Sequence, residues 1–127
     1  MESKGQIIAI GGGGFGRSPK NPKIEDYIVK LSSSNNPKIT FFPTASAENK
    51  DYVVNFYKAF LKLSCKPEYI SLFQNTPNLN DIIDNSDIIY IGGGNTKSML
   101  SVFKEWNLDQ MLLKAYKEGK ILCGVSA

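Results

Sequence analysis

Five short apolar runs of strand type alternate along the chain with segments of helical periodicity, and this alternation limits the fold more than any other feature. The runs are apolar at nearly every position, as in strands that are buried on both faces; they lie at residues 6–10, 38–42, 68–72, 87–91 and 120–125. Such strands belong to parallel sheets that helices cover on both sides. The pattern therefore predicts an α/β protein, a three-layer α/β/α sandwich around a mostly parallel sheet.

The segments between these runs carry apolar residues at the spacing of an amphipathic helix. In the first of them we expect Ile24, Tyr27, Ile28 and Leu31 to face the sheet, because they recur at i, i+3, i+4 and i+7. Asn78 can cap a short helix, and Gly119 can end the last one in the left-handed conformation. The expected helices cover about residues 24–31, 48–63, 79–83, 96–103 and 107–118.

Composition excludes several classes of function. Hydrophobic residues make up 42% and charged residues 21% of the 127 positions, which are globular values and indicate a single domain over 1–127. The net charge of +3 comes from scattered lysines, so nucleic acid is not an expected partner. The sequence shows no secretory signal and no run long enough to span a bilayer, so we expect a cytoplasmic protein without membrane contact. Cys65 and Cys123 lack metal-ligand spacing, and no motif requires a cofactor.

Glycine and small polar residues concentrate where the predicted strands end. These ends are residues 11–16, 43–47, 92–96 and the C-terminal Ser126. The carboxyl ends of parallel strands lie at one edge of the sheet, and ligand sites of α/β proteins lie just beyond them. We therefore expect one site formed by these four segments.

The last strand leads into Gly124-Val125-Ser126-Ala127, which matches most of a nucleophile elbow of the form G-x-S-x-G. Small residues flank the nucleophile of an elbow because the backbone there is strained and side chains would collide. Ser126 is therefore the candidate catalytic nucleophile. The backbone N–H of Ala127, the residue after it, is a candidate oxyanion donor.

The loop Gly92-Gly93-Gly94-Asn95-Thr96 is a candidate for the second half of an oxyanion hole. As an ordinary turn it would need only Asn95 or Thr96 as the N-cap of the next helix. Three successive glycines also allow backbone N–H groups to point into a site, and Gly94 is the expected second donor. We expect Gly93, Asn95 and Thr96, with Thr44 from the second strand end, to contact a substrate.

The sequence contains no histidine. A Ser-His-Asp/Glu site therefore cannot be completed from these residues. Lys97 or Lys120 could in principle serve as the base of a Ser-Lys pair, although no motif places either lysine near Ser126.

Gly11, Gly13 and Gly16 also satisfy the dinucleotide-binding pattern G-x-G-x-x-G after a strand. That pattern expects an acidic residue at the end of the second strand and a helix directly after the last glycine. The second strand ends in Phe41-Phe42-Pro43-Thr44 without an acid, and residues 17–22 separate Gly16 from the helix. Nucleotide binding is the weaker interpretation of this loop.

Three segments together resemble the peptidase E family of serine peptidases, which includes α-aspartyl dipeptidases and the related cyanophycinases. They are the Gly-Gly-Gly-Asn-Thr loop, Phe-Phe-Pro-Thr-Ala-Ser after the second strand, and the final Cys-Gly-Val-Ser-Ala. The resemblance implies a class I glutamine amidotransferase-like (flavodoxin-like) fold and hydrolysis of peptides with an N-terminal aspartate. It implies that Ser126 is the nucleophile of a Ser-His-Asp/Glu triad and that Gly94 and Ala127 donate to the oxyanion.

The family chain continues past the elbow, and its histidine, its acid and its substrate-recognising basic residues lie in that later part. The resemblance therefore implies a truncated, N-terminal portion of such a peptidase, inactive alone. We expect a small peptide as ligand, and a second copy of the chain or a complementing C-terminal chain as partner. The alternative is a non-catalytic binding or interaction protein that keeps the fold.

Overall fold

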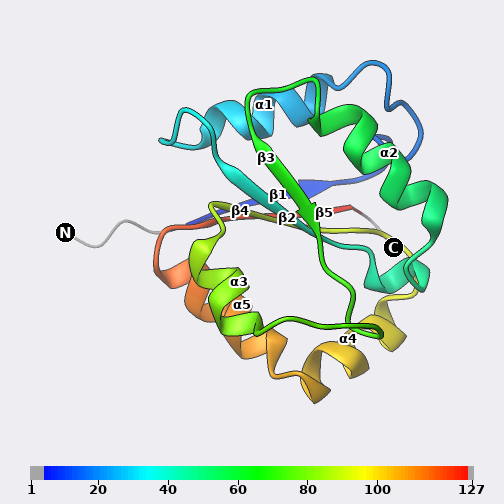
Figure 1. The fold of residues 1–127 in the computed structure, drawn as a ribbon, viewed down its shortest axis with the longest axis vertical. Coiled ribbons are helices and arrows are strands. Elements are labelled where there is room, and N and C mark those ends of the chain that lie inside the picture. Colours follow the sequence, from blue (N-terminus) through cyan, green and yellow to red (C-terminus); the bar gives the residue numbers. More distant parts are fainter. Residues whose placement is uncertain (1–4, 126–127) are drawn as a thin grey trace.

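The computed structural model describes residues 5–125, and its centre is a five-stranded sheet in which every pairing is parallel. The strand order is β1-β5-β4-β2-β3 (Figure 1). The strands are β1 (Gln6–Ile10), β2 (Lys38–Phe42), β3 (Lys66–Tyr69), β4 (Ile88–Ile91) and β5 (Ile121–Val125). β1 therefore lies beside β5, from the other end of the described chain.

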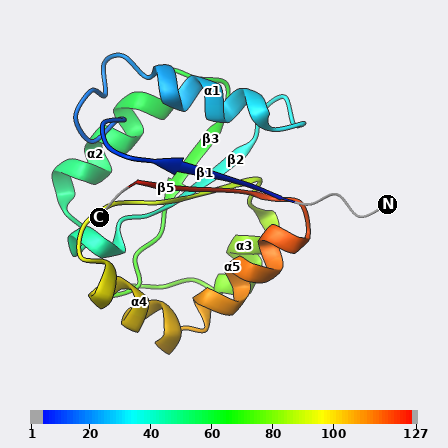
Figure 2. The ribbon, with the colours of Figure 1, turned by 180° about the vertical axis from the view of Figure 1, so that it is seen from behind.

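Helices cover both faces of the sheet, which confirms the predicted three-layer α/β/α sandwich. Helices α1 (Lys23–Leu31) and α2 (Lys50–Phe60) lie on one face. Helices α3 (Leu79–Asn85), α4 (Thr96–Glu105) and α5 (Leu108–Lys117) lie on the opposite face, below the sheet in Figure 2, which shows the molecule from behind. A single 3₁₀ turn, Thr44–Ser46, follows β2.

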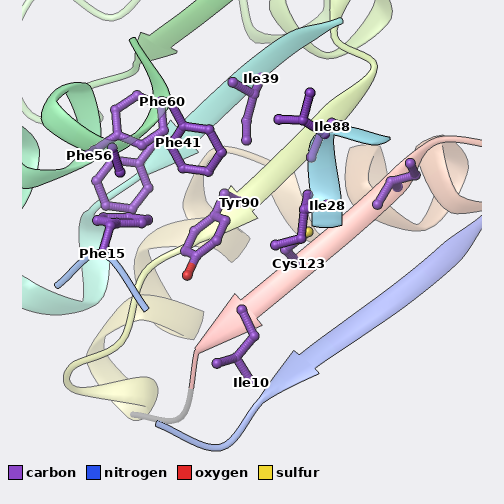
Figure 3. Close-up of a cluster of buried hydrophobic side chains, with 13 residues drawn as sticks. Ile10, Phe15, Ile28, Ile39, Phe41, Phe56, Phe60, Ile88, Tyr90 and Cys123 are labelled. Atoms are coloured by element: carbon purple, nitrogen blue, oxygen red, sulfur yellow. The ribbon is translucent and has the colours of Figure 1, made fainter. Parts of the chain in front are cut away.

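Each face of the sheet has its own apolar core. On the α1 and α2 side, aromatic rings pack against one another between the sheet and α2 (Figure 3), and the largest of them are Phe15, Phe41, Phe56, Phe60 and Tyr90. On the other side, Phe42 and Ile89 pack with Phe103 and Leu108 from α4 and α5. Burial of such side chains is the main source of stability of the sandwich.

The third strand is one residue shorter than the apolar run at 68–72 and begins two residues before it. β3 spans Lys66–Tyr69, and the chain turns away after Ile70, whose N–H donates to the Phe41 carbonyl at 2.9 Å. The N–H of Leu72 and the hydroxyl of Ser71 instead donate to the carboxylate of Glu48, at 2.8 and 2.7 Å. The run is apolar because Ile70 and Leu72 are buried beyond the strand end.

The predicted buried face of the first helix is also wrong in part. Ile24 and Tyr27 are 37% and 59% exposed, whereas Glu25, Ile28 and Val29 are buried. The helix is rotated because the carboxylate of Glu25 accepts a hydrogen bond from the Phe15 N–H at 3.0 Å. A buried acid at this position satisfies the backbone of the preceding loop.

The second helix starts later and ends earlier than the predicted 48–63. Asn49 caps it by accepting from the Tyr52 N–H at 3.0 Å, and Ala47 and Glu48 have positive φ angles, which helical residues do not adopt. The predictions that Asn78 caps α3 and that Gly119 ends α5 with positive φ are confirmed.

Candidate functional site

The carboxyl ends of β1, β2, β4 and β5 surround a cleft of about 530 Å³. The segments that the sequence singled out thus meet at one edge of the sheet, as parallel topology requires. The cleft is lined by Gly11, Gly12, Gly13, Gly16, Arg17, Ser46, Asn49, Tyr52, Gly93 and Val125.

In the sequence, the predicted nucleophile comes directly after a residue that lines this cleft. Val125, the last residue of β5, lines the cleft and immediately precedes Ser126. Ser126 and Ala127 lie outside the described residues. Their roles as nucleophile and oxyanion donor stay predictions that rest on the motif.

Gly94 is held by close packing against the turn after β2. A Cβ atom at this position would overlap the carbonyl group of Ala45, and the next residue, Asn95, donates its N–H to the same carbonyl oxygen at 2.7 Å. The φ angle of Gly94 is +149°, which residues with a side chain rarely adopt. Only glycine therefore fits here.

Gly93 lines the cleft, but its N–H is already used inside the protein. It donates to the phenolic oxygen of Tyr52 at 3.2 Å. Burial raises the pKa of Tyr52, so the ring stays a neutral phenol in the cleft wall. The neighbouring Gly92 has no room for a side chain, because the rings of Tyr52 and Phe41 fill the space beside it.

The other predicted substrate contacts lie outside the cleft lining. The side chain of Asn95 is the N-cap of α4 and accepts from the Ser98 N–H at 2.9 Å. Thr96 is the first residue of that helix and is exposed. Thr44 is buried, and its hydroxyl has no hydrogen-bond partner among the described residues. Of the four predicted contacts, the cleft includes Gly93.

The two lysines considered as bases lie elsewhere. Lys120 precedes β5, and its Nζ donates to the carbonyl oxygens of Asp84 and Ser86 at 2.9 and 2.6 Å. That position is the amino end of β5, opposite the end that leads to Ser126. Lys97 is an exposed residue of α4.

The two cysteines are poor nucleophiles. Burial raises the pKa of the Cys65 thiol to about 11 and that of Cys123 to about 12. A thiol that stays protonated at neutral pH does not attack carbonyl groups. Cys123 packs in the core of the α1 and α2 side.

A buried polar pair beneath the first glycine loop was missed by sequence reasoning. The Glu25 carboxylate and the Tyr90 hydroxyl both lie beside Gly14, where an added Cβ would contact them at 3.2 and 3.5 Å. Burial raises the pKa of Glu25, and the Tyr90 hydroxyl has no hydrogen-bond partner in the described part of the chain. The available signal in the sequence was the position of Glu25, which lies on the same helix face as the apolar Ile28 and Val29.

Arg17 was also missed. It is the only arginine in the sequence and follows the last glycine of the first loop, and the structure places it in the cleft wall. The chain has fourteen lysines and one arginine, and this arginine directly follows the G-x-G-x-x-G pattern. That position was the signal in the sequence that could have identified Arg17 as a site residue.

The residues from 5 to 125 contain no cluster of His, Cys, Asp and Glu suited to a metal ion. Within the same range, no helix is both long and apolar enough to cross a bilayer.

A covered parallel sheet with a glycine-lined cleft beyond its strand ends defines an α/β protein, a class in which small ligands bind at this edge of the sheet. Comparison with known proteins shows to which family of α/β proteins the chain belongs. The pattern of peptidase family S51 matches residues 7–127, so the chain belongs to this family of peptidases.

Two relatives define the extent of the match. The uncharacterized peptidase YgaJ of Bacillus subtilis (strain 168) is 44% identical over 125 residues, which are 96% of this chain and 54% of YgaJ. The uncharacterized peptidase PM1590 of Pasteurella multocida is 34% identical over 97 residues, or 72% of this chain and 46% of that protein. The chain thus spans about half the length of these relatives.

Solved structures support the fold. A Listeria monocytogenes EGD-e protein assigned to peptidase E superposes with a TM-score of 0.72 at 24% identity, over 98% of this chain and 59% of that one. A peptidase from an acI-B1 actinobacterium superposes with a TM-score of 0.79 at 14% identity, over 98% and 55% of the two chains. The predicted peptidase E-like fold is confirmed.

Proposed function

We propose that this chain carries the nucleophile side of a serine peptidase that hydrolyses peptides with an N-terminal aspartate. The observation that carries the proposal is the cleft itself. In a chain of family S51, it lies between Val125, which directly precedes Ser126, and the Gly92–Gly94 loop.

The chemistry assigned to the cleft is acyl transfer. The hydroxyl oxygen of Ser126 attacks the scissile carbonyl carbon, and its proton passes to a base outside these 127 residues, because the sequence has no histidine. The backbone N–H groups of Gly94 and Ala127 stabilise the oxyanion. The amine product leaves with a proton, and water then releases the acyl group from Ser126.

Peptide binding tests the first part of the proposal. We expect titration with Asp-Leu to shift the backbone amide resonances of Gly93 and Val125, which line the cleft. Resonances at the far end of the sheet, such as that of Lys120, serve as the control. Unshifted cleft amides at saturating peptide would contradict the proposal.

Hydrolysis tests the second part. The purified chain alone should release leucine from Asp-Leu no faster than buffer does. Addition of the part of YgaJ outside the aligned region, as a separate chain, should produce turnover that Ser126→Ala abolishes. Turnover by the unmodified chain alone, lost in Ser126→Ala, would show that a base lies within it.

A non-catalytic binding protein is the second candidate, because these 127 residues alone cannot complete a Ser-His-Asp/Glu triad. It predicts that Asp-Leu binds in the cleft and stays intact under every condition of the hydrolysis test. The two candidates therefore share the binding result and differ in turnover.

A further inference from the structure

Arg17 gives the cleft its charge. Among the described residues that line the cleft, Arg17 is the only one with a charged side chain, and the rest are glycines, neutral polar side chains and Val125. An anionic group in this cleft would thus meet a cation and no carboxylate. A cationic group would meet no carboxylate among the described residues that line the cleft.

The backbone around Arg17 is fixed. The N–H groups of Arg17 and Ser18 both donate to the carbonyl oxygen of Gly14, at 3.1 and 2.9 Å. On one side of this turn Phe15 is fully buried in the aromatic core, and on the other the side-chain amide of Asn55 donates to the Gly16 carbonyl at 3.4 Å. The guanidinium group therefore extends from an ordered turn.

The guanidinium has no carboxylate partner within residues 5–125. The ion pairs found there join lysines to acids, namely Lys30–Asp26, Lys38–Glu68 and Lys114–Glu118. A guanidinium presents a planar fork of N–H donors that matches both oxygens of a carboxylate, and a lysine lacks this geometry. In this structure the fork is available to a ligand.

We propose that Arg17 recognises the side-chain carboxylate of the acidic residue in the substrate. The assignment rests on the proposed function, because it takes the cleft as the peptide site. It makes Arg17 a specificity-determining residue: it distinguishes an acidic side chain from the neutral amide of the same shape. It also places part of the substrate-recognising charge within these 127 residues.

The first test uses the uniqueness of Arg17. Phenylglyoxal reacts with arginine, so the intact chain should gain one modified side chain, located at Arg17 by peptide mapping. We expect Asp-Leu to slow this modification and Asn-Leu, at equal concentration, to leave its rate unchanged. Equal rates with and without saturating Asp-Leu would overturn the assignment.

The second test compares affinities of three variants for the two peptides. Arg17→Gln should weaken Asp-Leu binding about tenfold, the effect of losing one charge-assisted hydrogen bond, and leave Asn-Leu binding unchanged. Arg17→Lys should keep part of the affinity. Lys20→Gln is the matched control, because it removes the same charge from the same loop outside the cleft lining and should change neither affinity.

The outcomes separate the assignment from the proposed function. If Arg17→Gln binds Asp-Leu as tightly as the unmodified chain, Arg17 is not the recognition residue, and the peptide site stands. If the unmodified chain binds Asp-Leu and Asn-Leu equally, carboxylate recognition is excluded. If neither peptide binds the unmodified chain, the proposed function fails, and the assignment fails with it.

Discussion

At the scale of single residues, Gly94 shows the difference between a permissive and a required glycine. Its missing side chain allows the Gly92–Thr96 loop to pack on the carbonyl group of Ala45. At Gly124, by contrast, an added Cβ would meet nothing within 4 Å. Gly94 and Gly124, both in the predicted active site, are therefore under different constraints.

Gly94→Ala should lower the free energy of unfolding by about 1–3 kcal/mol, because the new Cβ overlaps the backbone of the turn after β2. Gly124→Ala should change it by less than about 0.5 kcal/mol. Urea unfolding of both variants measures the difference. Equal stability of the two would show that the loop moves freely away from Ala45.

The hydroxyl groups of Tyr90 and Tyr52 should have opposite effects on stability. Tyr90→Phe removes a buried hydroxyl that has no partner among the described residues, so unfolding should cost about 1 kcal/mol more. Tyr52→Phe removes the acceptor of the Gly93 N–H, so unfolding should cost about 1 kcal/mol less. Thermal melts report both shifts. A loss of stability in Tyr90→Phe would reveal a hydrogen bond to this hydroxyl.

Glu25 should make the stability depend on pH. Burial raises its pKa above the ordinary value of 4.5, so the unfolded chain loses this proton at lower pH than the folded chain. The contribution of Glu25 to the free energy of unfolding is fully present below pH 4.5. It is lost as the pH rises through the pKa that Glu25 has in the folded protein. The free energy of unfolding of Glu25→Gln, relative to the unmodified chain, should therefore increase from pH 4.5 upward.

Denaturant titrations between pH 4 and 8 measure this difference. Asp26→Asn is the control for the loss of one negative charge on the same helix, because Asp26 is exposed and pairs with Lys30. A difference between Glu25→Gln and the unmodified chain that is constant over this range would contradict the prediction.

At the scale of elements, asparagine side chains cap the start of three helices. Asn49, Asn78 and Asn95 cap α2, α3 and α4, and each accepts a hydrogen bond from the backbone N–H three residues later. These caps are local, so sequence reasoning identified Asn78 directly and gave Asn95 as one of two candidates beside Thr96. α5 differs, because Asn107 has positive φ and its side chain caps no N–H.

Asn78→Ala should lower the free energy of unfolding by about 1 kcal/mol through loss of the cap, and Asn78→Ser should restore most of it. Asn80→Ala, at an exposed position inside α3, is the matched control and should be neutral or slightly stabilising. Chemical denaturation compares the three. A neutral Asn78→Ala would mean that packing alone fixes the start of α3.

The same distinction between local and distant causes explains what the sequence could predict. The strands around Phe41 and Ile89, the parallel sheet and the loops at its carboxyl edge follow from apolar runs and glycines. The buried Glu25 and the early end of β3 depend on hydrogen bonds to Phe15 and Glu48, which lie elsewhere in the sequence. Periodicity carries no information about such partners.

At the scale of the whole molecule, β1 is an edge strand of the sheet that residues 5–125 form, and no described strand pairs with its outer side. Ile7 on this edge is 66% exposed and pairs in register with Leu122 of β5. An apolar edge strand is a template for pairing with another chain. We propose that this edge mediates association, with a second copy of the chain as the simplest partner.

Light scattering at micromolar concentration should show a dimer that Ile7→Lys converts to a monomer, because a charge on the edge opposes strand pairing. Leu61→Lys is the matched control, since Leu61 is 68% exposed after the end of α2 and lies outside the sheet. A monomer mass for the unmodified chain, or equal dissociation by both substitutions, would contradict the proposal.

The pairing of β1 with β5 also determines the order in which the chain can fold. Gln6 is matched with Ile121, so the contact that places the first strand closes a loop of nearly the whole described chain. Loop closure over such a distance is slow, and a ribosome delivers β5 last among the described strands. Until then Ile7, Ile8 and Ile10 have no strand partner in the sheet. The nascent protein therefore presents its first strand to chaperones and to other chains until residues 121–125 have been synthesised.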